Sequence, residues 1–346
     1  MNVKIVKQVV GIDVAQDELV VSLGHLQQDL SIRILSRKEF ANNAVGFSKL
    51  VAWSLKAIDQ SVLFQFVMEA TGVYHEALAY YLADRGYSVS IVLPNKISNY
   101  MRTLETKTIT DYTSAEAIMM FGLQRNLESW QRPAEVYRKL QQLTRERDQI
   151  ILFRTMAKNR LHAERAQAMP DKESVARYNK QITFFNKQVA EIMTAINATV
   201  KSNAELKSNV DRSCTIPGVG LLTAATILAE THGFNLIKNK KQLVSYAGLD
   251  VKEKQSGTSV KGKPKISKRG NRHLRKCLHM PALAAIKSDE RLKGVFARLV
   301  AKHGIKMKAA VAVQRKLLEM VYVLHKKNET YNPNYYKKLE SNIVAP

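Results

Sequence analysis

The chain has 346 residues, 45% of them hydrophobic, which allows two or three domains with a sizeable core and excludes general disorder. Its formal net charge is +24 at pH 7. This excess favours a nucleic-acid partner over a small acidic substrate, because contacts to many phosphates release many counterions at once.

The apolar segments and the cysteines narrow the class further. No apolar run approaches the roughly eighteen residues that span a bilayer. The apolar start at 5–12 contains Lys7 and Gln8 and ends at Asp13, unlike a signal peptide. Cys214 and Cys277 cannot build a disulfide framework, and no ligand spacing of a zinc site occurs. We therefore expect a reducing, cytoplasmic compartment and no membrane partner.

Residues 1–128 have the pattern of an α/β domain. Apolar runs predict strands at 9–14, 19–23, 31–35, 62–68 and 87–93, and helical spacing predicts helices at 42–57 and 75–85. Three strands, a helix, and then alternating strands and helices indicate a mixed central sheet.

Three acids in this domain are candidate metal ligands. Asp13 and Glu69 each end an apolar strand, and Asp111 precedes a further helix. A buried carboxylate is costly unless it is paired or metal-bound, and carboxylates at one sheet end suit Mg²⁺. Two such ions can clamp the oxygens of a phosphoryl transfer. The alternatives are that Asp13 and Glu69 begin turns and that Asp111 is a helix N-cap. Thr113 and Glu116 have capping-box spacing, which predicts a structural role for Glu116.

Residues 129–208 contain two series of apolar residues spaced by three and four positions, separated by an interruption at 169–171. The spacing predicts two long helices, folded as an antiparallel hairpin or paired with another subunit. We expect a coiled-coil helical arm that serves in oligomerisation, without catalytic or metal-binding residues.

Residues 209–330 are expected to form a mainly helical domain, followed by a tail at 331–346. A Pro-Gly-Val-Gly turn at 217–220 precedes a predicted helix at 222–230. Through Gly218 and Gly220 such a turn can offer backbone N–H groups to a phosphate, as hairpins between DNA-binding helices do. A tight interhelical turn is the alternative. Further helices are predicted at 273–286 and 306–325.

A cationic strip at 247–276 interrupts this helical pattern. Its glycines and proline exclude a long helix before Asn271, and its one acid between 252 and 276 is Glu253. Ser256 lies beside Gly257, which lets a ligand approach the backbone closely. The charge predicts nucleic-acid binding, with Ser256 either at the ligand or only a turn residue. The candidate contacts are Lys252, Lys254, Lys261, Lys263, Lys265, Lys268, Arg269, Arg272 and Arg275.

Eight short motifs follow one another along nearly the whole chain. They are G-I-D-V-A at 11–15, E-A-T-G-V-Y at 69–74, L-P-N at 93–95, T-D at 110–111, I-P-G-V-G at 216–220, S-Y-A-G-L at 245–249, Q-S-G-T-S-V at 255–260 and I-S-K-R-G-N at 266–271. In this order and spacing the chain resembles the insertion-sequence one-hundred-and-ten family of transposases, whose relatives include Piv-type DNA invertases.

The resemblance implies a ribonuclease-H-like (RuvC-like) N-terminal domain, similar to Holliday-junction resolvases, and a C-terminal transposase domain. By matching positions, it implies that Asp13, Glu69 and Asp111 hold Mg²⁺, expected as two ions. It further implies that Ser256 is a nucleophile.

The chain departs from the family pattern at two positions. The usual fourth acid, three residues after the third, is Ser114 here, which leaves this serine as a candidate ligand through a water. The usual Lys before the T-D pair is Ile109, although Lys107 is nearby.

The resemblance also implies the function. We expect a transposase or recombinase that cleaves and exchanges strands of donor and target DNA through a phosphoserine intermediate, guided by a structured non-coding (bridge) RNA. We expect a homo-oligomer, either a dimer or a tetramer. We expect it in the bacterial cytoplasm, associated with the nucleoid. Three alternatives remain: a Piv-like invertase, a non-catalytic nucleic-acid-binding protein, and a junction nuclease that uses water in place of Ser256.

Overall fold

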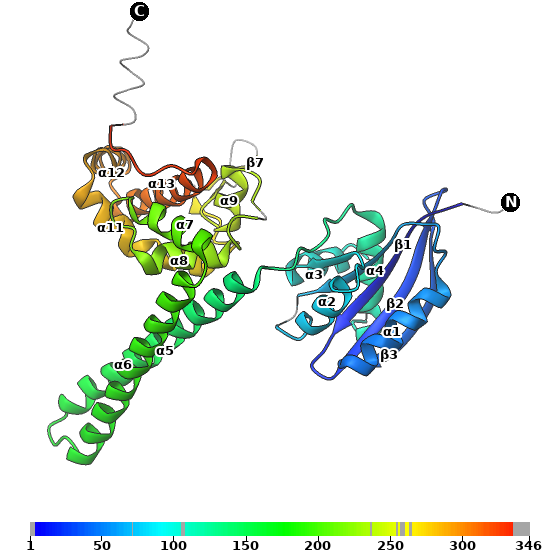
Figure 1. Cartoon of the computed structure of the whole chain (residues 1–346), viewed down its shortest axis with the longest axis horizontal. Helices are drawn as coiled ribbons and strands as arrows, with labels where there is room; N and C mark the ends of the chain where they lie inside the picture. Colours follow the sequence, from blue (N-terminus) through cyan, green and yellow to red (C-terminus); the bar gives the residue numbers. More distant parts are fainter. Residues whose placement is uncertain are drawn as a thin grey trace, which may run out of the picture. The chain divides into compact units, whose positions relative to one another are not determined.

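The computed structural model describes residues 4–70, 72–104, 108–235, 237–253, 255–256, 260–262 and 265–334, with the backbone alone at 255, 256, 260 and 261. The chain forms two compact units, Met1–Arg132 and Pro133–Pro346 (Figure 1). This division lies close to the predicted boundary at 128. The two long helices of the expected arm belong to the second unit, so separate domains at 129–208 and 209–330 stay predictions.

A five-stranded mixed sheet forms the centre of the first unit. Its strands are β1 (Ile5–Val14), β2 (Glu18–Gln27), β3 (Ile32–Ala41), β4 (Phe64–Glu69) and β5 (Val89–Val92), in the spatial order β3-β2-β1-β4-β5. The first three strands are antiparallel, whereas β4 and β5 run parallel to β1. This order and these directions are those of a ribonuclease-H-like sheet, as the resemblance predicts.

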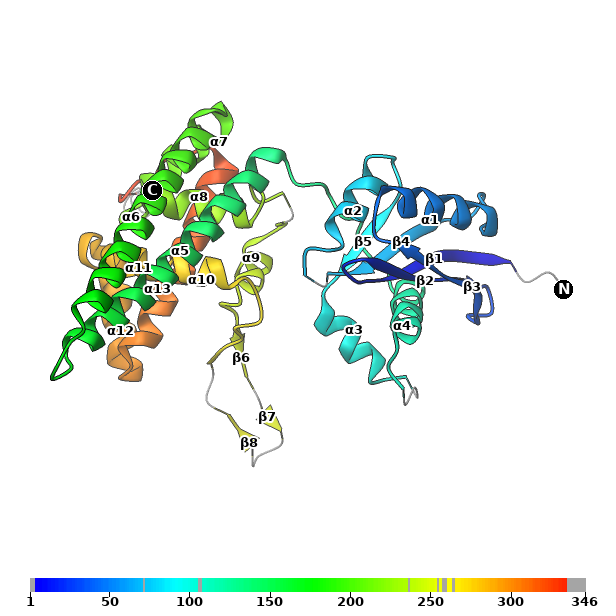
Figure 2. The same cartoon turned by 90° about the horizontal axis from the view of Figure 1, so that it is seen from below.

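Helices cover both faces of this sheet (Figure 2). Helices α1 (Ala44–Ala57) and α2 (Glu76–Ala83) pack on the face that includes Val10 and Ile12. Helices α3 (Pro94–Met101) and α4 (Asp111–Gln124) pack on the opposite face, which includes Val9 and Val67. Since side chains alternate between the faces of a strand, odd-numbered positions of β1 and β4 lie on the α4 side.

The first three strands are longer than predicted. Each has ten residues, because regular pairing continues beyond the apolar segments that the pattern detects. Strand β3 is an edge strand and is mostly exposed, so its outer residues are polar and give no apolar signal.

The described part of the second unit is mainly helical. Helices α5 (Glu135–Arg165) and α6 (Lys172–Lys201) lie side by side as an antiparallel pair (Figure 1), and the predicted interruption falls in their connection. Helix α8 (Leu221–Glu230) is buried from Ala224 onward. Around it pack α5, α6, α7 (Ala204–Cys214) and α10 (Arg272–Cys277). The remaining helices are α9 (Lys240–Tyr246), α11 (His279–Ser288), α12 (Glu290–His303) and α13 (Lys306–Lys327).

Two sequence-based expectations for this unit need correction. The single helix expected at 273–286 is two helices, α10 and α11, which meet at Leu278. The cationic strip is not simply a loop. Strands β6 (Val251–Lys252) and β9 (Lys265–Ile266) pair, as do β7 (Gln255–Ser256) and β8 (Val260–Lys261), so the strip extends as a β-hairpin (Figure 2).

Across the helices of the described residues, no segment combines the length and the apolar character that crossing a membrane requires.

Candidate active site

Helix α4 approaches the sheet closely because glycines occupy the contact points. A Cβ added at Gly11 would lie 2.3 Å from the backbone nitrogen of Met119 and 2.5 Å from the carbonyl oxygen of Ala115. A Cβ at Gly122 would lie 2.9 Å from the Val9 side chain. Ala115, early in α4, therefore faces Gly11, and Gly122, late in α4, faces Val9, which comes before Gly11 in β1. Helix α4 runs antiparallel to β1, and its N-terminus lies at the carboxyl ends of β1 and β4.

The two strand acids lie on the face that α4 covers. Asp13 is inside β1, and Glu69 is the last residue of β4. The parallel register pairs Ile12 with Met68, so Asp13 and Glu69 follow at neighbouring positions on the two strands. Both are odd-numbered positions on the α4 side of the sheet. The alternative that Asp13 begins a turn is therefore wrong.

The third acid reaches the same edge from α4. Asp111 lies four residues before Ala115, about 6 Å along a helix. Asp13 lies two residues beyond Gly11, about 7 Å along a strand. The two acids are thus at similar heights on facing elements, and Asp111 is exposed whereas Asp13 and Glu69 are half-buried.

The capping of α4 differs from both structural alternatives. Thr110 is the N-cap, and its side chain accepts a hydrogen bond from the Thr113 backbone N–H, while the Thr113 hydroxyl pairs with the Thr110 backbone N–H. Asp111 is therefore the first helical residue and not the cap. Glu116 forms an ion pair with Arg37 at 2.5 Å and takes no part in a capping box with Thr113. Its structural role stands, but for a different reason.

The electrostatics show that Asp111 and Glu69 lie close enough to act on Asp13. The pKa of Asp13 is raised to about 6, first by burial and then by the negative charges of Asp111 and Glu69, against a lowering by the Val14 backbone. Among the described residues, the groups that set this pKa include no Lys or Arg. Within the described part of the chain, the edge of the sheet is therefore a region of concentrated negative charge around Asp13.

The carboxylates of Asp13, Glu69 and Asp111 are chemically suited to bind a divalent cation. Carboxylate oxygens are hard ligands of the kind that Mg²⁺ binds. Ser114 is half-buried and lies one helical turn after Asp111, so it is near the same edge. Over the described ranges, however, no three His, Cys, Asp or Glu side chains are grouped tightly enough to form a complete ligand set. Lys107 lies outside the described residues.

The second candidate element is the hairpin that bears Ser256. Ser256 pairs with Val260 across β7 and β8, which places it near the turn of the hairpin. Lys252, Lys265, Lys268, Arg269 and Arg272 are exposed along the strip. The side chains of Ser256 and Lys261 are not described, and Lys254 and Lys263 lie outside the described residues.

A buried glutamate anchors the base of this hairpin, and sequence reasoning missed it. Glu230, at the end of α8, is completely buried and accepts from Arg145 Nε at 2.7 Å, Arg145 Nη2 at 2.8 Å and Asn271 Nδ2 at 2.6 Å. Its backbone carbonyl accepts from the Tyr246 hydroxyl at 2.9 Å. Tyr246 precedes the strip and Asn271 lies near its end, so one residue holds both ends. The available signal in the sequence was an acid, Glu230, at the end of an otherwise apolar helix.

Other contacts stiffen the same base. The Ser267 hydroxyl donates to Asp250 at 2.5 Å, and Arg275 Nη1 donates to the carbonyl oxygens of Ala247 at 2.8 Å and Gly270 at 3.1 Å. The guanidinium of Arg275 is therefore used within the protein. Its role as a nucleic-acid contact stays a prediction.

The Pro-Gly-Val-Gly turn has a clear packing function at its first glycine. Gly218 has φ +84°, and a Cβ there would lie 2.5 Å from the Pro281 carbonyl oxygen on α11. This supports the interhelical-turn alternative at Gly218. Gly220, the N-cap of α8, is exposed, and a Cβ there would meet no atom within 4 Å, so phosphate contact there stays a prediction.

Comparisons with known proteins agree on the class. A family model described as a transposase (DEDD_Tnp_IS110) matches residues 10–170, and a second, described as the transposase IS116/IS110/IS902 family, matches 211–297. The two matches do not overlap and together span well over half of the chain. These matches identify the chain as a transposase-class protein.

Similar individual proteins include both transposases and an invertase. The pilin gene-inverting protein of Moraxella bovis is 28% identical over 303 residues, covering 86% of this chain and 91% of that protein. The transposase for insertion sequence element IS1111A of Coxiella burnetii is 31% identical over 139 residues, covering 38% and 37%. On the two family-model matches, at 10–170 and 211–297, the chain belongs to the IS116/IS110/IS902 transposase family.

A solved structure of T. thermophilus RuvC in complex with a Holliday junction substrate matches 34% of this chain and 97% of that one, at 10% identity. Its TM-score is 0.26, too low to support an argument, so the fold assignment rests on the strand order given above.

Proposed function

We propose that this protein is the DNA recombinase of a mobile element, which cuts donor and target DNA and exchanges the strands. The observation that supports this most is the meeting of Asp13, Glu69 and Asp111 at one sheet edge, with the pKa of Asp13 raised, in a member of a transposase family. Such a site suits chemistry on a phosphodiester, where negative charge develops in the transition state.

In this proposal Asp13, Glu69 and Asp111 would hold Mg²⁺, with Ser114 as a ligand through a water. The family pattern suggests two ions. Bound there, the cation would supply charge stabilisation at the scissile phosphate. The carboxylates repel one another and would approach more closely once neutralised.

Ser256 is the proposed nucleophile. Its oxygen would bond to the phosphorus of one DNA phosphodiester as the bond from that phosphorus to a DNA oxygen breaks. Ser256 loses its proton, and the released DNA hydroxyl gains one. Attack by a hydroxyl of the partner strand on the phosphoserine then rejoins the DNA and restores the serine. The exposed lysines Lys252, Lys265 and Lys268 would position the DNA strand by contacts to its phosphates.

Strand exchange between two plasmids in the presence of Mg²⁺ tests the proposal. We expect Asp13→Asn to reduce strand cleavage by about 10²- to 10³-fold, as loss of one key electrostatic group does, while DNA binding persists. Glu116→Gln is the matched control, because Glu116 is on α4 but pairs with Arg37. If Asp13→Asn cleaved as well as the control did, the acids would not be the catalytic site.

The serine step has its own test. Ser256→Ala protein should form no covalent protein–DNA adduct and should rejoin no strands, while DNA binding stays within about twofold, because one hydroxyl adds little to a phosphate-dominated contact. Cleavage that persisted without an adduct would instead support a nuclease that uses water.

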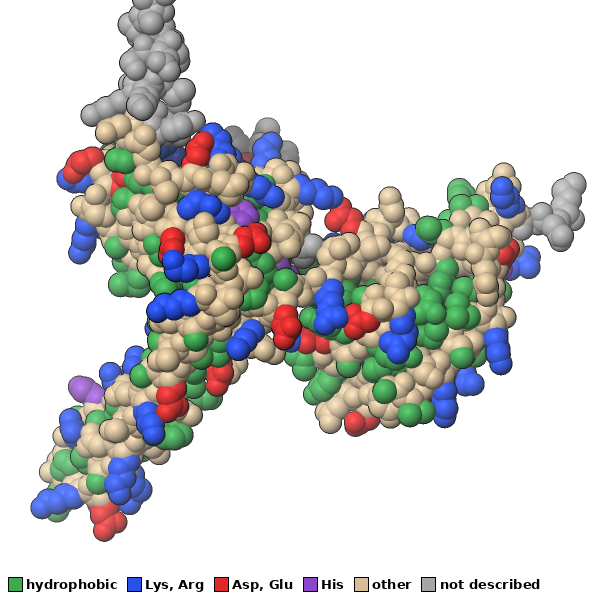
Figure 3. All heavy atoms as spheres, viewed as in Figure 1, with side chains coloured by type: hydrophobic (Ala, Val, Ile, Leu, Met, Phe, Trp, Pro, Cys, Tyr) green, Lys and Arg blue, Asp and Glu red, His purple; other side chains and the backbone are tan. Residues whose placement is uncertain are grey.

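We further propose that a structured RNA guides the protein to its DNA. The net charge of +24 is compatible with contacts to the phosphates of both RNA and DNA. Lys and Arg side chains are spread over both units on the face seen in Figure 3 and are not confined to one patch. Sequencing the RNA that copurifies, and then comparing recombination with and without it, tests this step. Undiminished recombination by RNA-free protein would contradict it.

Inversion of a fixed chromosomal segment is the second candidate. The pilin gene-inverting protein of Moraxella bovis matches 86% of this chain, which favours the same chemistry on inverted sites. Plasmids that carry the element ends in direct or in inverted orientation separate the two functions. Products of insertion into a second plasmid indicate transposition, and inversion alone indicates an invertase.

A further inference from the structure

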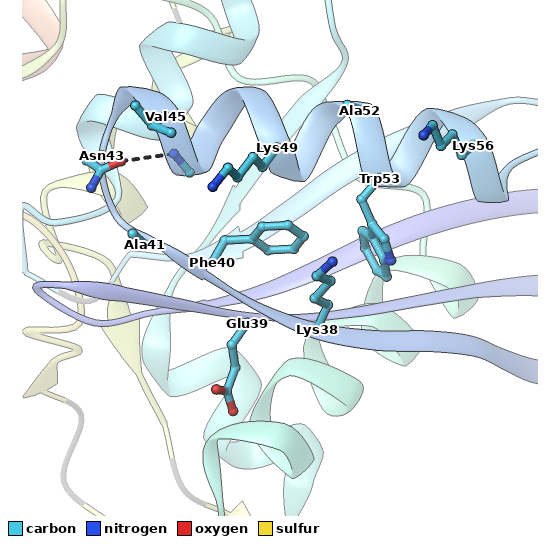
Figure 4. Close-up of a pocket in the computed structure, with 11 residues that line it drawn as sticks. Lys38, Glu39, Phe40, Ala41, Asn43, Val45, Lys49, Ala52, Trp53 and Lys56 are labelled. Atoms are coloured by element: carbon cyan, nitrogen blue, oxygen red, sulfur yellow. Dashed lines mark hydrogen bonds between the residues drawn. The ribbon is translucent and has the colours of Figure 1, made fainter.

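A cationic groove runs along the edge of the sheet on the face opposite the three acids. It lies between β3 and α1, has a volume of about 740 Å³ and is open to solvent (Figure 4). Its floor is formed by Phe40 and Trp53, whose ring centroids are 5.6 Å apart. Its sides carry Lys38, Lys49 and Lys56. We call this feature the edge groove.

The local sequence explains its shape. On α1, positions 45, 49, 52, 53 and 56 follow helical spacing and therefore share one face. Ala52 is small and leaves room beside Trp53. On β3, Lys38 and Phe40 are two residues apart and point to the same side, toward α1 (Figure 4).

The charge of the edge groove is of one sign. Glu39 is its one acidic lining residue, and its side chain points to the other face of the sheet (Figure 4). There it accepts a hydrogen bond from Tyr112 of α4, which raises the pKa of that phenol. Among the ion pairs of the described residues, none involves Lys38, Lys49 or Lys56. Lys38 Nζ lies over the Phe40 ring, 5.6 Å from its centroid, a cation–π contact that does not neutralise the charge. All three lysines can therefore still pair with an anionic ligand.

The dimensions favour a polymer over a small anion. Lys49 and Lys56 are seven residues apart, about 10 Å along the helix axis. This separation exceeds what one phosphate group can bridge, and Lys38 adds a third charge from the opposite side. An open, positively charged groove with an aromatic side chain on its floor is the arrangement that binds single-stranded nucleic acid, through phosphates on the lysines and a base stacked on the ring.

We propose that the edge groove binds a single-stranded segment of nucleic acid, with its phosphates on Lys38, Lys49 and Lys56 and one base against Trp53. The strand is RNA or DNA, since both offer phosphates and bases. The site extends the proposed function by giving the guide or substrate strand a place distinct from the acids. It does not depend on the chemistry at Asp13, because the groove and the acids occupy opposite faces of the sheet.

The two tryptophans of the chain allow a direct test. In the Trp130→Phe variant, Trp53 is the sole tryptophan, so its fluorescence reports on the groove alone. Trp130 packs edge-on against Tyr80, a contact that Phe can keep. Titration at low salt with single-stranded RNA and with single-stranded DNA of about 12 nucleotides should quench Trp53 emission. The strand that quenches at the lower concentration identifies the ligand.

In the same background, Lys38→Gln/Lys49→Gln/Lys56→Gln should raise the concentration for half-quenching about tenfold or more, because three phosphate contacts are lost. The matched control, Lys158→Gln/Lys172→Gln/Lys180→Gln, removes the same charge from exposed positions on α5 and α6 and should change it by less than about threefold. All six lysines are exposed, and an unchanged thermal unfolding curve checks the fold.

Three results would overturn the proposal. The first is labelled oligonucleotide that binds while Trp53 emission stays constant. The second is equal weakening by the two lysine sets. The third is equal quenching by polyglutamate, which would indicate an acidic polypeptide as the occupant. Asp13→Asn protein should quench normally, so failure of the groove and failure of the proposed recombinase are distinguishable.

Discussion

Two buried or half-buried acids, one in each unit, have opposite surroundings. Asp13 has a pKa raised to about 6, and the charged groups that shift it, among the described residues, are two further acids. Burial alone would also raise the pKa of Glu230, but hydrogen bonds from Arg145 and Asn271 outweigh it, and this pKa lies below its ordinary value. One site accumulates like charge, and the other neutralises it.

The difference separates a site for a ligand from a structural anchor. A carboxylate that accepts from an arginine and an amide has its hydrogen bonds satisfied and stabilises the fold in place. Carboxylates that repel one another reduce stability, and such an arrangement is typical of functional sites.

Removing the anchor should have the largest effect on stability. Glu230→Ala leaves the Arg145 guanidinium without its carboxylate and should lower the free energy of unfolding by roughly 3 kcal/mol. Urea unfolding of the intact chain measures it. Glu319→Ala is the control: its ion pair with Arg315 is on a partly exposed helix face, and its loss should cost only about 0.4 kcal/mol. Similar losses in the two variants would mean that Glu230 is not an anchor.

The two acids should also give opposite pH dependence. Because the folded pKa of Glu230 is lowered, its stabilising contribution is present above its unfolded pKa of 4.5 and is lost as pH falls through the folded pKa. Glu230→Gln should therefore flatten the loss of stability in acid. If Glu230→Gln lost as much stability at low pH as the parent protein does, this prediction would be contradicted.

For Asp13 the sign reverses. Its folded pKa of about 6 lies above the ordinary 3.8, so its destabilising contribution grows as pH rises between these values and is complete above them. Allowing for its partial exposure, Asp13→Asn should raise the free energy of unfolding at neutral pH by on the order of 1 kcal/mol. Unfolding curves in chelator check this. A variant less stable than the parent protein would show that Asp13 has a structural role.

The smallest expected change concerns the position that departs from the family pattern. Ser114→Asp adds a carboxylate one turn after Asp111, so it should lower the Mg²⁺ concentration for half-maximal strand cleavage a few-fold, by about 1 kcal/mol or less. Ser114→Asn is similar in size but uncharged. Equal Mg²⁺ requirements for the two variants would show that position 114 does not contribute to the site.

The sequence predicts the acid site better than the anchor for a physical reason. Asp13 and Glu69 end apolar strands, a local pattern, and parallel pairing brings such ends together. Glu230 looks like the last residue of an apolar helix, and its partners, Arg145 and Asn271, are distant in sequence. Only the packed helices show that a buried charge is satisfied there.

A helix and a surface feature were missed for different reasons. Helix α12 has apolar residues at helical spacing, namely Leu292, Val295, Phe296, Leu299 and Val300, so the signal of an amphipathic helix was available in its sequence. Its polar cap was a second signal, because Asp289 accepts from the Leu292 N–H at 2.8 Å. The edge groove has no local signal, because its lysines come from two elements whose pairing is a tertiary feature.

Magnesium binding tests the central contrast most directly. We expect Mg²⁺ to raise the thermal unfolding temperature of the first unit in the parent protein, because a ligand of the folded state stabilises it. Glu116→Gln should respond equally, and Asp13→Asn should respond little or not at all. An equal rise in Asp13→Asn would contradict the assignment of Asp13, Glu69 and Asp111 as the metal-binding acids.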